Sequence, residues 1–113
     1  MKRFVALYVA DTSIPKDGRP DLDPATIEKG MKAWGDWMGQ HGGSVVDQGG
    51  PLGKTKTASK AGVADSRNKV TGYVVVQAES HDAAVRMFEG HPHFSIFPGE
   101  AVEVMEVLPI PGM

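Results

Sequence analysis

The chain has 113 residues, a formal net charge of −2 and no cysteine. This length predicts one domain over residues 1–113, and the lack of cysteine excludes disulfides and a thiol nucleophile. Scattered Lys and Arg residues in a slightly acidic chain argue against a nucleic-acid partner. No apolar run approaches the roughly 20 residues that span a bilayer, so we expect a cytoplasmic protein with no membrane partner.

The first half of the chain predicts a strand, a long helix and a second strand. Residues 4–9 are apolar on both faces, which favours a covered strand over a signal peptide. Asp23 followed by Pro24 is typical of a helix start, and two glycines follow the helix end near Gln40. The predicted elements are a strand at 4–9, a polar loop at 11–23, a helix at 24–41, a strand at 44–48 and a Gly-Gly-Pro bend at 49–51.

The predicted helix carries apolar residues at helical spacing. Ile27, Met31, Trp34 and Met38 share one stripe, and Trp37 lies beside it. This pattern favours Trp34 in the core and Trp37 half-exposed or at an interface. The alternative is that both tryptophans line an aromatic pocket for a small ring.

The second half repeats the pattern with a stronger strand. Residues 70–78 alternate between a small apolar face and a mixed face, as expected of a strand. Ser80 is placed to cap a short helix, and Gly90 is a natural stop. Phe88 and His91 share one face of that helix, so we expect His91 to point toward the sheet. Residues 55–58 are strand-like, 59–68 form a loop or hairpin, 95–99 form a connection, and 101–108 form the last strand.

The order β-α-β-β-α-β predicts a ferredoxin-like α+β fold, with a four-stranded antiparallel sheet and two helices on one face. The uncovered face would still carry Tyr73 and Val75, together with one apolar set from the first strand. A second copy could cover this face. We therefore expect a homodimer with the architecture of a dimeric α+β barrel.

Four ordered segments resemble the YCII-related family, which includes the DGPF-domain proteins. They are Met1 to Tyr8; Trp34 to Trp37 with Gly42-Gly43 and Gly49 to Leu52; Val70 to Ala84; and His91-Pro92 with Val102 to Val104. The resemblance implies a dimeric α+β barrel and a cofactor-independent lyase, isomerase or dehalogenase-like activity on a small cyclic or aromatic acid. The DGPF tetrapeptide is absent, and Asp65-Ser66-Arg67-Asn68 stands in its place. Relatives with a His–Asp pair carry its His in the first helix, where this chain has tryptophans.

The acid–base candidates are His91, His41 and Asp47. His91 would act from the floor of a pocket between helix and sheet, or would be a satisfied core histidine. His41 lies at the expected helix C-terminus, with Asp47 on the next strand as its possible orienting group. The alternative for His41 is a solvated histidine that interacts with the helix dipole.

His93, Trp34, Trp37 and Tyr73 complete the predicted small-molecule pocket. His91 and His93 have a spacing that can bind a metal, but no further ligands have an evident spacing, so we expect no metal site and no cofactor. If His91 packs in the core instead, His93 would be exposed.

Three functions remain open from the residues alone. The first is a His-based enzyme in which Tyr73 or Asp47 assists. The second is a non-catalytic small-ligand-binding or sensing dimer, and the third is a structural partner domain without a ligand. An inward histidine with a carboxylate partner favours the enzyme, a pocket of Trp, Met and Val favours binding, and a sealed interior favours the structural role.

Overall fold

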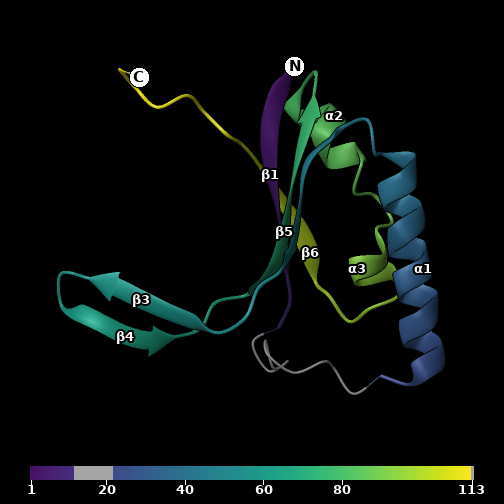
Figure 1. The fold of residues 1–113 in the computed structure, drawn as a ribbon, viewed down its shortest axis with the longest axis horizontal. Helices are drawn as coiled ribbons and strands as arrows, with labels where there is room; N and C mark the ends of the chain where they lie inside the picture. The colour runs from purple at the N-terminus through teal and green to yellow at the C-terminus, as the bar shows by residue number, and fades with distance from the viewer. Residues whose placement is uncertain (12–21, 113) are drawn as a thin grey trace.

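The structure is a computed structural model that describes residues 1–11 and 22–112. Most of the loop expected at 11–23 lies outside the described residues. The elements are β1 (Lys2–Val9), α1 (Pro24–Gln40), β2 (Val45–Pro51), β3 (Thr55–Ser59), β4 (Gly62–Ser66), β5 (Val70–Ala78), α2 (His81–Arg86), α3 (Pro92–Ser95) and β6 (Ala101–Glu106), as Figure 1 shows. No helix in this part of the chain is both long and apolar enough to cross a membrane.

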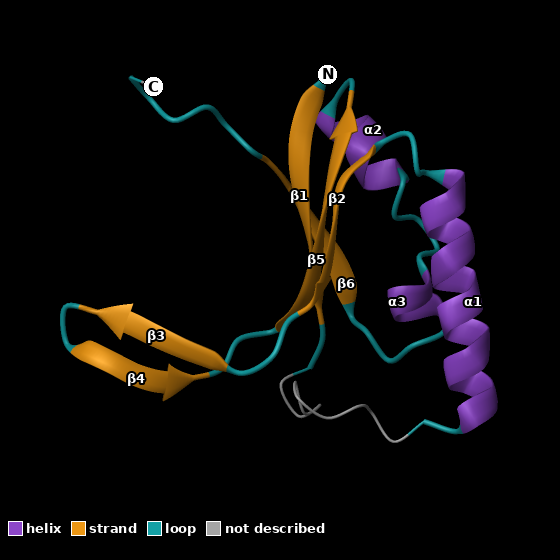
Figure 2. Cartoon of the chain, in the orientation of Figure 1, coloured by secondary structure: helices purple, strands orange, loops and turns teal. Residues whose placement is uncertain are grey.

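The main sheet confirms the predicted ferredoxin-like α+β fold. Its four strands run in the order β2-β5-β1-β6, and every neighbouring pair is antiparallel. The three helices lie on one side of this sheet (Figure 2). The two strongest strand patterns, β1 and β5, are central and pair along their whole length. Both strands carry apolar residues on both faces, which is the pattern of a sheet that is covered on both sides.

The helix-covered face of the sheet forms the core. Phe4 and Ala6 of β1 are fully buried, as are Val74 and Val76 of β5. The register places Phe4 opposite Val76 and Ala6 opposite Val74, so these side chains form one apolar layer. Tyr8 continues the layer opposite Gly72, which leaves room for the tyrosine ring because it has no side chain.

Helix α1 begins and ends as predicted, and Trp34 of its predicted stripe packs against the core, but the buried face also includes Trp37. Its Asp23 cap accepts a hydrogen bond from the Thr26 amide at 2.6 Å. Trp37 is buried and donates its indole N–H to the Met87 carbonyl at 2.7 Å, whereas Met31 is 60% exposed. The prediction of a half-exposed Trp37 was therefore wrong.

Gly30 explains why the buried face of α1 lies away from Met31. This glycine is buried, and a Cβ there would lie 2.3 Å from the Phe97 ring. The ring of Phe97 therefore occupies the space beside the helix, and the buried line runs through Gly30 and Trp37 instead of through Met31.

Strand β2 continues through the predicted bend at 49–51 and ends at Pro51. It carries two register irregularities, and Gly49, within the second of them, has a φ of +61°. A side chain at Gly49 would place its Cβ 1.9 Å from the Tyr73 carbonyl oxygen, so only glycine fits. The glycines thus shape a bulge within the strand instead of ending it.

The strand-like residues 55–58 and the segment 59–68, predicted as a loop or hairpin, form a two-stranded hairpin, β3–β4. Figure 1 shows it projecting from the sheet on the side away from α1. Lys56 and Asp65 form a cross-strand ion pair at 2.6 Å. Val63 on this hairpin is 73% exposed, so the hairpin adds little to the core of the chain.

The second face of the sheet remains apolar and is not covered by the described helices (Figure 2). Val5 pairs with Val75 and with Met105 across the three strands β5, β1 and β6. Val5 and Val75 are half-buried and Met105 is 43% exposed. We call the side chains of Val5, Leu7, Tyr73, Val75 and Met105 the outer face.

Candidate functional site

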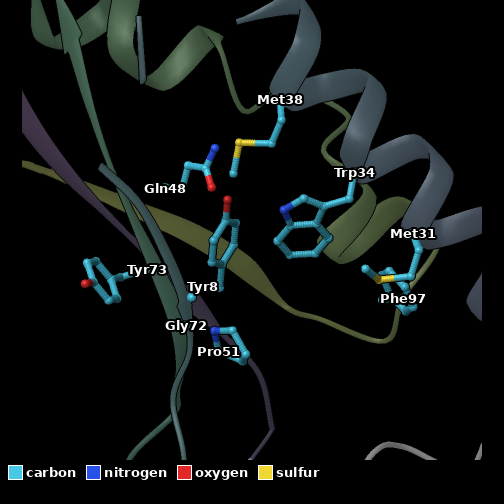
Figure 3. Close-up of a pocket in the computed structure, with 10 residues that line it drawn as sticks. Tyr8, Met31, Trp34, Met38, Gln48, Pro51, Gly72, Tyr73 and Phe97 are labelled. Atoms are coloured by element: carbon cyan, nitrogen blue, oxygen red, sulfur yellow. The ribbon is translucent and has the colours of Figure 1, made fainter. Parts of the chain in front are cut away.

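A pocket of about 320 Å³ lies between α1 and the main sheet (Figure 3). This volume suits a small ring compound. Its lining combines aromatic rings, methionines and the glycine-rich end of β2. The lining residues are Tyr8, Met31, Trp34, Met38, Gln48, Gly50, Pro51, Gly72, Tyr73 and Phe97.

Tyr8 supplies a hydroxyl group to this mostly apolar lining. Its side chain leaves β1 on the core face, and the residue is 4% exposed. Burial raises the pKa of the Tyr8 phenol well above its usual value, because a phenolate would be poorly solvated there. Tyr8 is therefore a neutral hydroxyl group at physiological pH, able to donate a hydrogen bond.

His91 lies directly behind the Tyr8 hydroxyl. Its Nε2 atom is 3.4 Å from the Tyr8 Oη atom, at the long end of hydrogen-bond distances. His91 is only 1% exposed. Burial lowers the pKa of His91 to about 4, and the neighbouring His93 and His41 act in the same direction. The imidazole is therefore uncharged at neutral pH.

The backbone fixes which nitrogen of His91 carries the proton. Gly90, with a φ of +67°, turns the chain after α2 so that His91 becomes the N-cap of α3. The His91 Nδ1 atom accepts a hydrogen bond from the His93 amide at 3.0 Å, so Nδ1 is unprotonated. In a neutral imidazole the proton then resides on Nε2, which donates it toward Tyr8. This leaves the Tyr8 proton available for a ligand.

Aromatic rings enclose this histidine. The ring centroids of Trp34 and Trp37 lie 4.6 and 4.9 Å from that of His91, and Phe88 lies at 5.8 Å. These rings exclude water from the contact between His91 and Tyr8. A hydrogen bond in such an environment is electrostatically stronger than one in water.

His93 lies in the core but not in the pocket lining. Its Nε2 atom donates to the Val9 carbonyl at 2.8 Å, which ties α3 to the end of β1. A Cβ at Gly99 would lie 2.3 Å from this ring, so the loop before β6 packs closely over it. The pKa of His93 is lowered, first by burial. His93 is 7% exposed, and its observed role is to hold backbone segments together.

The structure does not bring His41 and Asp47 together. His41 is half-buried at the end of α1, with its ring 4.9 Å from that of Trp37. Asp47 is exposed, and its Oδ1 atom accepts from the Gly49 amide at 2.9 Å. Neither residue is part of the pocket lining, and Asp47 instead supports the bulge in β2.

The two predicted aromatic pocket residues on α1 occupy different places. Trp34 lines the pocket, whereas Trp37 lies deeper, in the core. Tyr73 is at the pocket edge, but Figure 3 shows its ring directed away from Trp34, across the sheet. The hydroxyl group that faces the pocket belongs to Tyr8 instead.

Sequence reasoning missed Tyr8, Gln48 and Phe97 as pocket residues. Tyr8 had a usable signal, because strand alternation places it on the same face as Phe4 and Ala6. The role of Gln48 depends on the bulge in β2, and no local pattern predicts it.

The described residues contain no group of three or more His, Asp or Glu side chains able to hold a metal ion. Within these residues, the side-chain hydrogen bonds of His91 are to Tyr8 and to the His93 amide, not to a carboxylate. An inward histidine with a carboxylate partner was the expected sign of an enzyme. The structure instead pairs the inward His91 with Tyr8.

Comparisons with known proteins support the fold. No model of a known family matches the chain, and a search of curated proteins found no match. The solved structure of 5-chloro-2-hydroxyhydroquinone dehydrochlorinase (TftG) from Burkholderia phenoliruptrix AC1100, in complex with 2,5-dihydroxybenzoquinone, is similar. It covers 93% of this chain and 91% of its own, with 16% identity and a TM-score of 0.52.

A solution structure of the hypothetical Arabidopsis thaliana protein AT3G17210 covers 99% of this chain and 90% of its own, with 14% identity and a TM-score of 0.43. At 16% identity, the likeness to the dehydrochlorinase establishes a shared α+β fold.

Proposed function

We propose that this chain is a cofactor-independent enzyme of the YCII-related type that performs acid–base chemistry on a small cyclic or aromatic compound. The observation that carries this proposal is the buried Tyr8 hydroxyl, backed by the His91 imidazole and facing an aromatic pocket. Lyase, isomerase and dehalogenase reactions on such rings all pass through species in which a ring oxygen gains negative charge. A fixed donor beside that oxygen stabilises the charge as it develops.

Tyr8 is suited to this role because it remains protonated. A phenol in an apolar site donates to the developing oxyanion, while the His91 Nε2–H donates to the phenol oxygen and polarises it. The described lining contains no carboxylate or imidazole, so water at the open side of the pocket carries the protons. When a chlorinated hydroquinone loses HCl, one hydroxyl proton is returned to the carbon that bears chlorine, the C–Cl bond breaks and chloride leaves to solvent. The second hydroxyl proton passes to water, which leaves a quinone. In this scheme His91 positions Tyr8, and Tyr8 contacts the substrate.

The dehydrochlorinase comparison suggests where to look for a substrate. That protein is named for a chlorinated hydroxyhydroquinone and was solved with a dihydroxybenzoquinone. We propose the same broad class here, hydroxylated or quinonoid rings that lose a halide.

The test is halide release from a panel of chlorinated dihydroxybenzenes and trihydroxybenzenes. We expect wild-type turnover of at least one ring, and about a 100-fold loss of kcat/KM in Tyr8→Phe, in line with the loss of one oxyanion donor. Thr57→Val is the control, since Thr57 lies on β3 outside the described pocket lining, and it should keep wild-type activity. Equal activity of wild type and Tyr8→Phe would refute the proposed role of Tyr8.

A second candidate is non-catalytic binding of the same class of ring. The apolar lining and the lack of a described proton acceptor favour it. Binding of a chlorinated dihydroxybenzene without halide release from any member of the panel would select this function over the first.

We also propose that two copies associate through the outer face to form a dimeric α+β barrel. Support comes from the apolar side chains of Val5, Val75 and Met105 on a face that the described helices leave uncovered. A second sheet of the same kind would bury these side chains.

A further inference from the structure

Two hydrogen-bonding side chains, those of Tyr8 and the solvent-exposed Gln48, stand at one end of an otherwise apolar lining. Gln48 reaches this end from β2, and Tyr8 reaches it from β1. In Figure 3 the Gln48 amide and the Tyr8 hydroxyl point toward one another, with the end of the Met38 side chain beside them. Two groups from different strands thus converge on one edge of any ring that lies against Trp34.

The bulge in β2 places Gln48 on the pocket side. Asp47 lies opposite Val75, whose side chain is on the outer face, so the next residue points toward the helices. The Asp47 carboxylate holds the turn by accepting from the Gly49 amide at 2.9 Å. Since Gly49 can carry no side chain against Tyr73, the position of this turn is fixed.

The hydrogen-bonding capacities of the two groups complement each other. With its oxygen accepting from His91, Tyr8 offers its own proton to a ligand oxygen. The Gln48 amide has both a carbonyl acceptor and an NH₂ donor, so it can pair with a neighbouring hydroxyl or carbonyl. None of the described lining residues is charged at neutral pH, so this part of the wall gives a carboxylate no counter-charge.

From this convergence we infer that Gln48 is a specificity-determining residue and that the pocket selects an uncharged ring with two adjacent oxygen atoms. This inference rests on the proposed function of the pocket and narrows its substrate class. The expected substrate is then a catechol-like or ortho-hydroxyquinone-like ring, in place of the cyclic or aromatic acid predicted from the sequence.

Calorimetric titration with three simple probes tests the inference. Catechol and hydroquinone have the same composition and differ only in whether their oxygens are adjacent, and benzoate tests for an anion. We expect wild type to bind catechol about fivefold more tightly than hydroquinone, which is the effect of one net hydrogen bond at a group that water can otherwise reach. Benzoate should bind more weakly than either.

Gln48→Leu should reduce the preference for catechol to less than about twofold, because leucine fills similar space without polar atoms. Hydroquinone affinity should change little. Gln77→Leu is the control, since Gln77 lies on β5 outside the pocket lining, and its preference should match wild type. Equal affinity for the two isomers, an undiminished preference in Gln48→Leu, tighter binding of benzoate, or no binding of any probe would each overturn the inference.

Different results would refute the enzyme proposal and the specificity inference. Halide release that depends on Tyr8, together with equal binding of catechol and hydroquinone, would leave the enzyme proposal standing and remove the role of Gln48. A catechol preference that depends on Gln48, without halide release from any ring, would keep the specificity inference and remove catalysis.

Discussion

The contact between Tyr8 and His91 joins residues 83 positions apart in the chain. Each is held by its own local structure: Tyr8 by the alternation of β1, and His91 by the turn at Gly90 and its cap on α3. The backbone therefore sets both positions without a rearrangement of flexible side chains. The geometry at the pocket therefore exists before a ligand arrives, which is the condition for efficient stabilisation of developing charge.

The state of His91 can be measured directly. We expect its imidazole signals to remain unchanged between pH 5 and 8 in a two-dimensional NMR titration, because burial lowers its pKa to about 4. The nitrogen shifts should show a protonated Nε2 and an unprotonated Nδ1. His91→Asn identifies the signal by its disappearance. Titration of that signal near the ordinary value of about 6.5 would contradict this environment.

The lowered pKa of His91 also predicts an acid-sensitive fold. Above about pH 6.5 the ring is neutral in both the folded and the unfolded chain, so its full contribution to stability is present. As the pH falls from about 6.5 to 4, the unfolded chain takes up the proton first, and the free energy of unfolding declines. His93 acts in the same direction, because its pKa is also lowered.

The loss due to His91 should not exceed about 3 kcal/mol, given about 1.4 kcal/mol per pKa unit. Chemical denaturation at pH 7.5 and 4.5 measures it. His91→Asn should show a smaller decline between these two pH values than wild type. An identical decline in both proteins would show that another group governs the acid sensitivity.

For single residues, the sequence predicted some positions and missed the partnerships. The predicted burial of His91 is confirmed, but its predicted cause is wrong, because α2 ends at Arg86 and His91 instead caps α3 after the turn at Gly90. The tyrosine chosen as its helper was Tyr73, because it lies in the same segment, whereas the observed partner comes from β1. The order of strands in the sheet decides which residues meet. The residue pattern within a single strand does not reveal that order.

Among the elements, helix α1 shows how one small residue sets the packing of a long segment. Gly30 is buried against Phe97, whereas a Cβ added at Gly35 or Gly39 of the same helix would meet no atom within 4 Å. The three glycines look equivalent in the sequence. Only one of them admits a neighbouring ring, and that ring also lines the pocket.

Alanine substitutions separate these glycines. Gly35→Ala and Gly39→Ala should each stabilise the protein by up to about 1 kcal/mol, since alanine favours the helix and meets no neighbour. Gly30→Ala should be less stable than Gly35→Ala by about 1–3 kcal/mol, because the Phe97 ring must move. Thermal denaturation of the three variants gives the comparison. Equal stability of all three would show that Phe97 does not require Gly30.

Local signals predicted most elements well. The Asp23 and Ser80 caps lie where expected, with hydrogen bonds to Thr26 and Ala83. The continuation of β2 through Gly49 was missed because a Gly-Gly-Pro run usually ends a strand, and here the pairing with β5 keeps the segment extended. The short helix α3 was not predicted, and Pro92 opens it at its first turn.

For the molecule as a whole, an α+β sheet covered on one side explains the two-sided apolar pattern of β1 and β5. The core face carries residues such as Phe4 and Val76, and the outer face carries Val5 and Val75. The fold could be predicted from the order of elements, because that order has few compact solutions. The pocket could not be predicted, since it depends on how α1 is rotated on the sheet.

The proposed dimer predicts a charge-sensitive association. Met105→Glu introduces a carboxylate on the outer face, at a side chain that is 43% exposed, so folding should be unaffected. We expect its dimer dissociation constant to rise at least about tenfold, because an unpaired charge would be buried at the interface. Sedimentation velocity over a concentration series measures this.

Val85→Glu is the matched control for this prediction. Val85 lies on α2, in the helix layer, and is 45% exposed, which is close to the exposure of Met105. Its association should equal that of wild type. A monomeric wild-type protein at all concentrations, or equal weakening by both substitutions, would argue against the outer face as the interface.

Whether His91 acts through Tyr8 is best measured by a double-mutant cycle. The cycle is made on kcat/KM for a ring that the wild type turns over, or on affinity for catechol if only binding is found. Tyr8→Phe removes the donor, and His91→Asn removes the Nε2–H while leaving a side chain that caps helices well. If His91 acts through Tyr8, the double variant should be no worse than Tyr8→Phe alone. Additive losses in the double variant would mean that His91 acts on the ligand independently of Tyr8, and would contradict the pairing of these two residues as one functional unit.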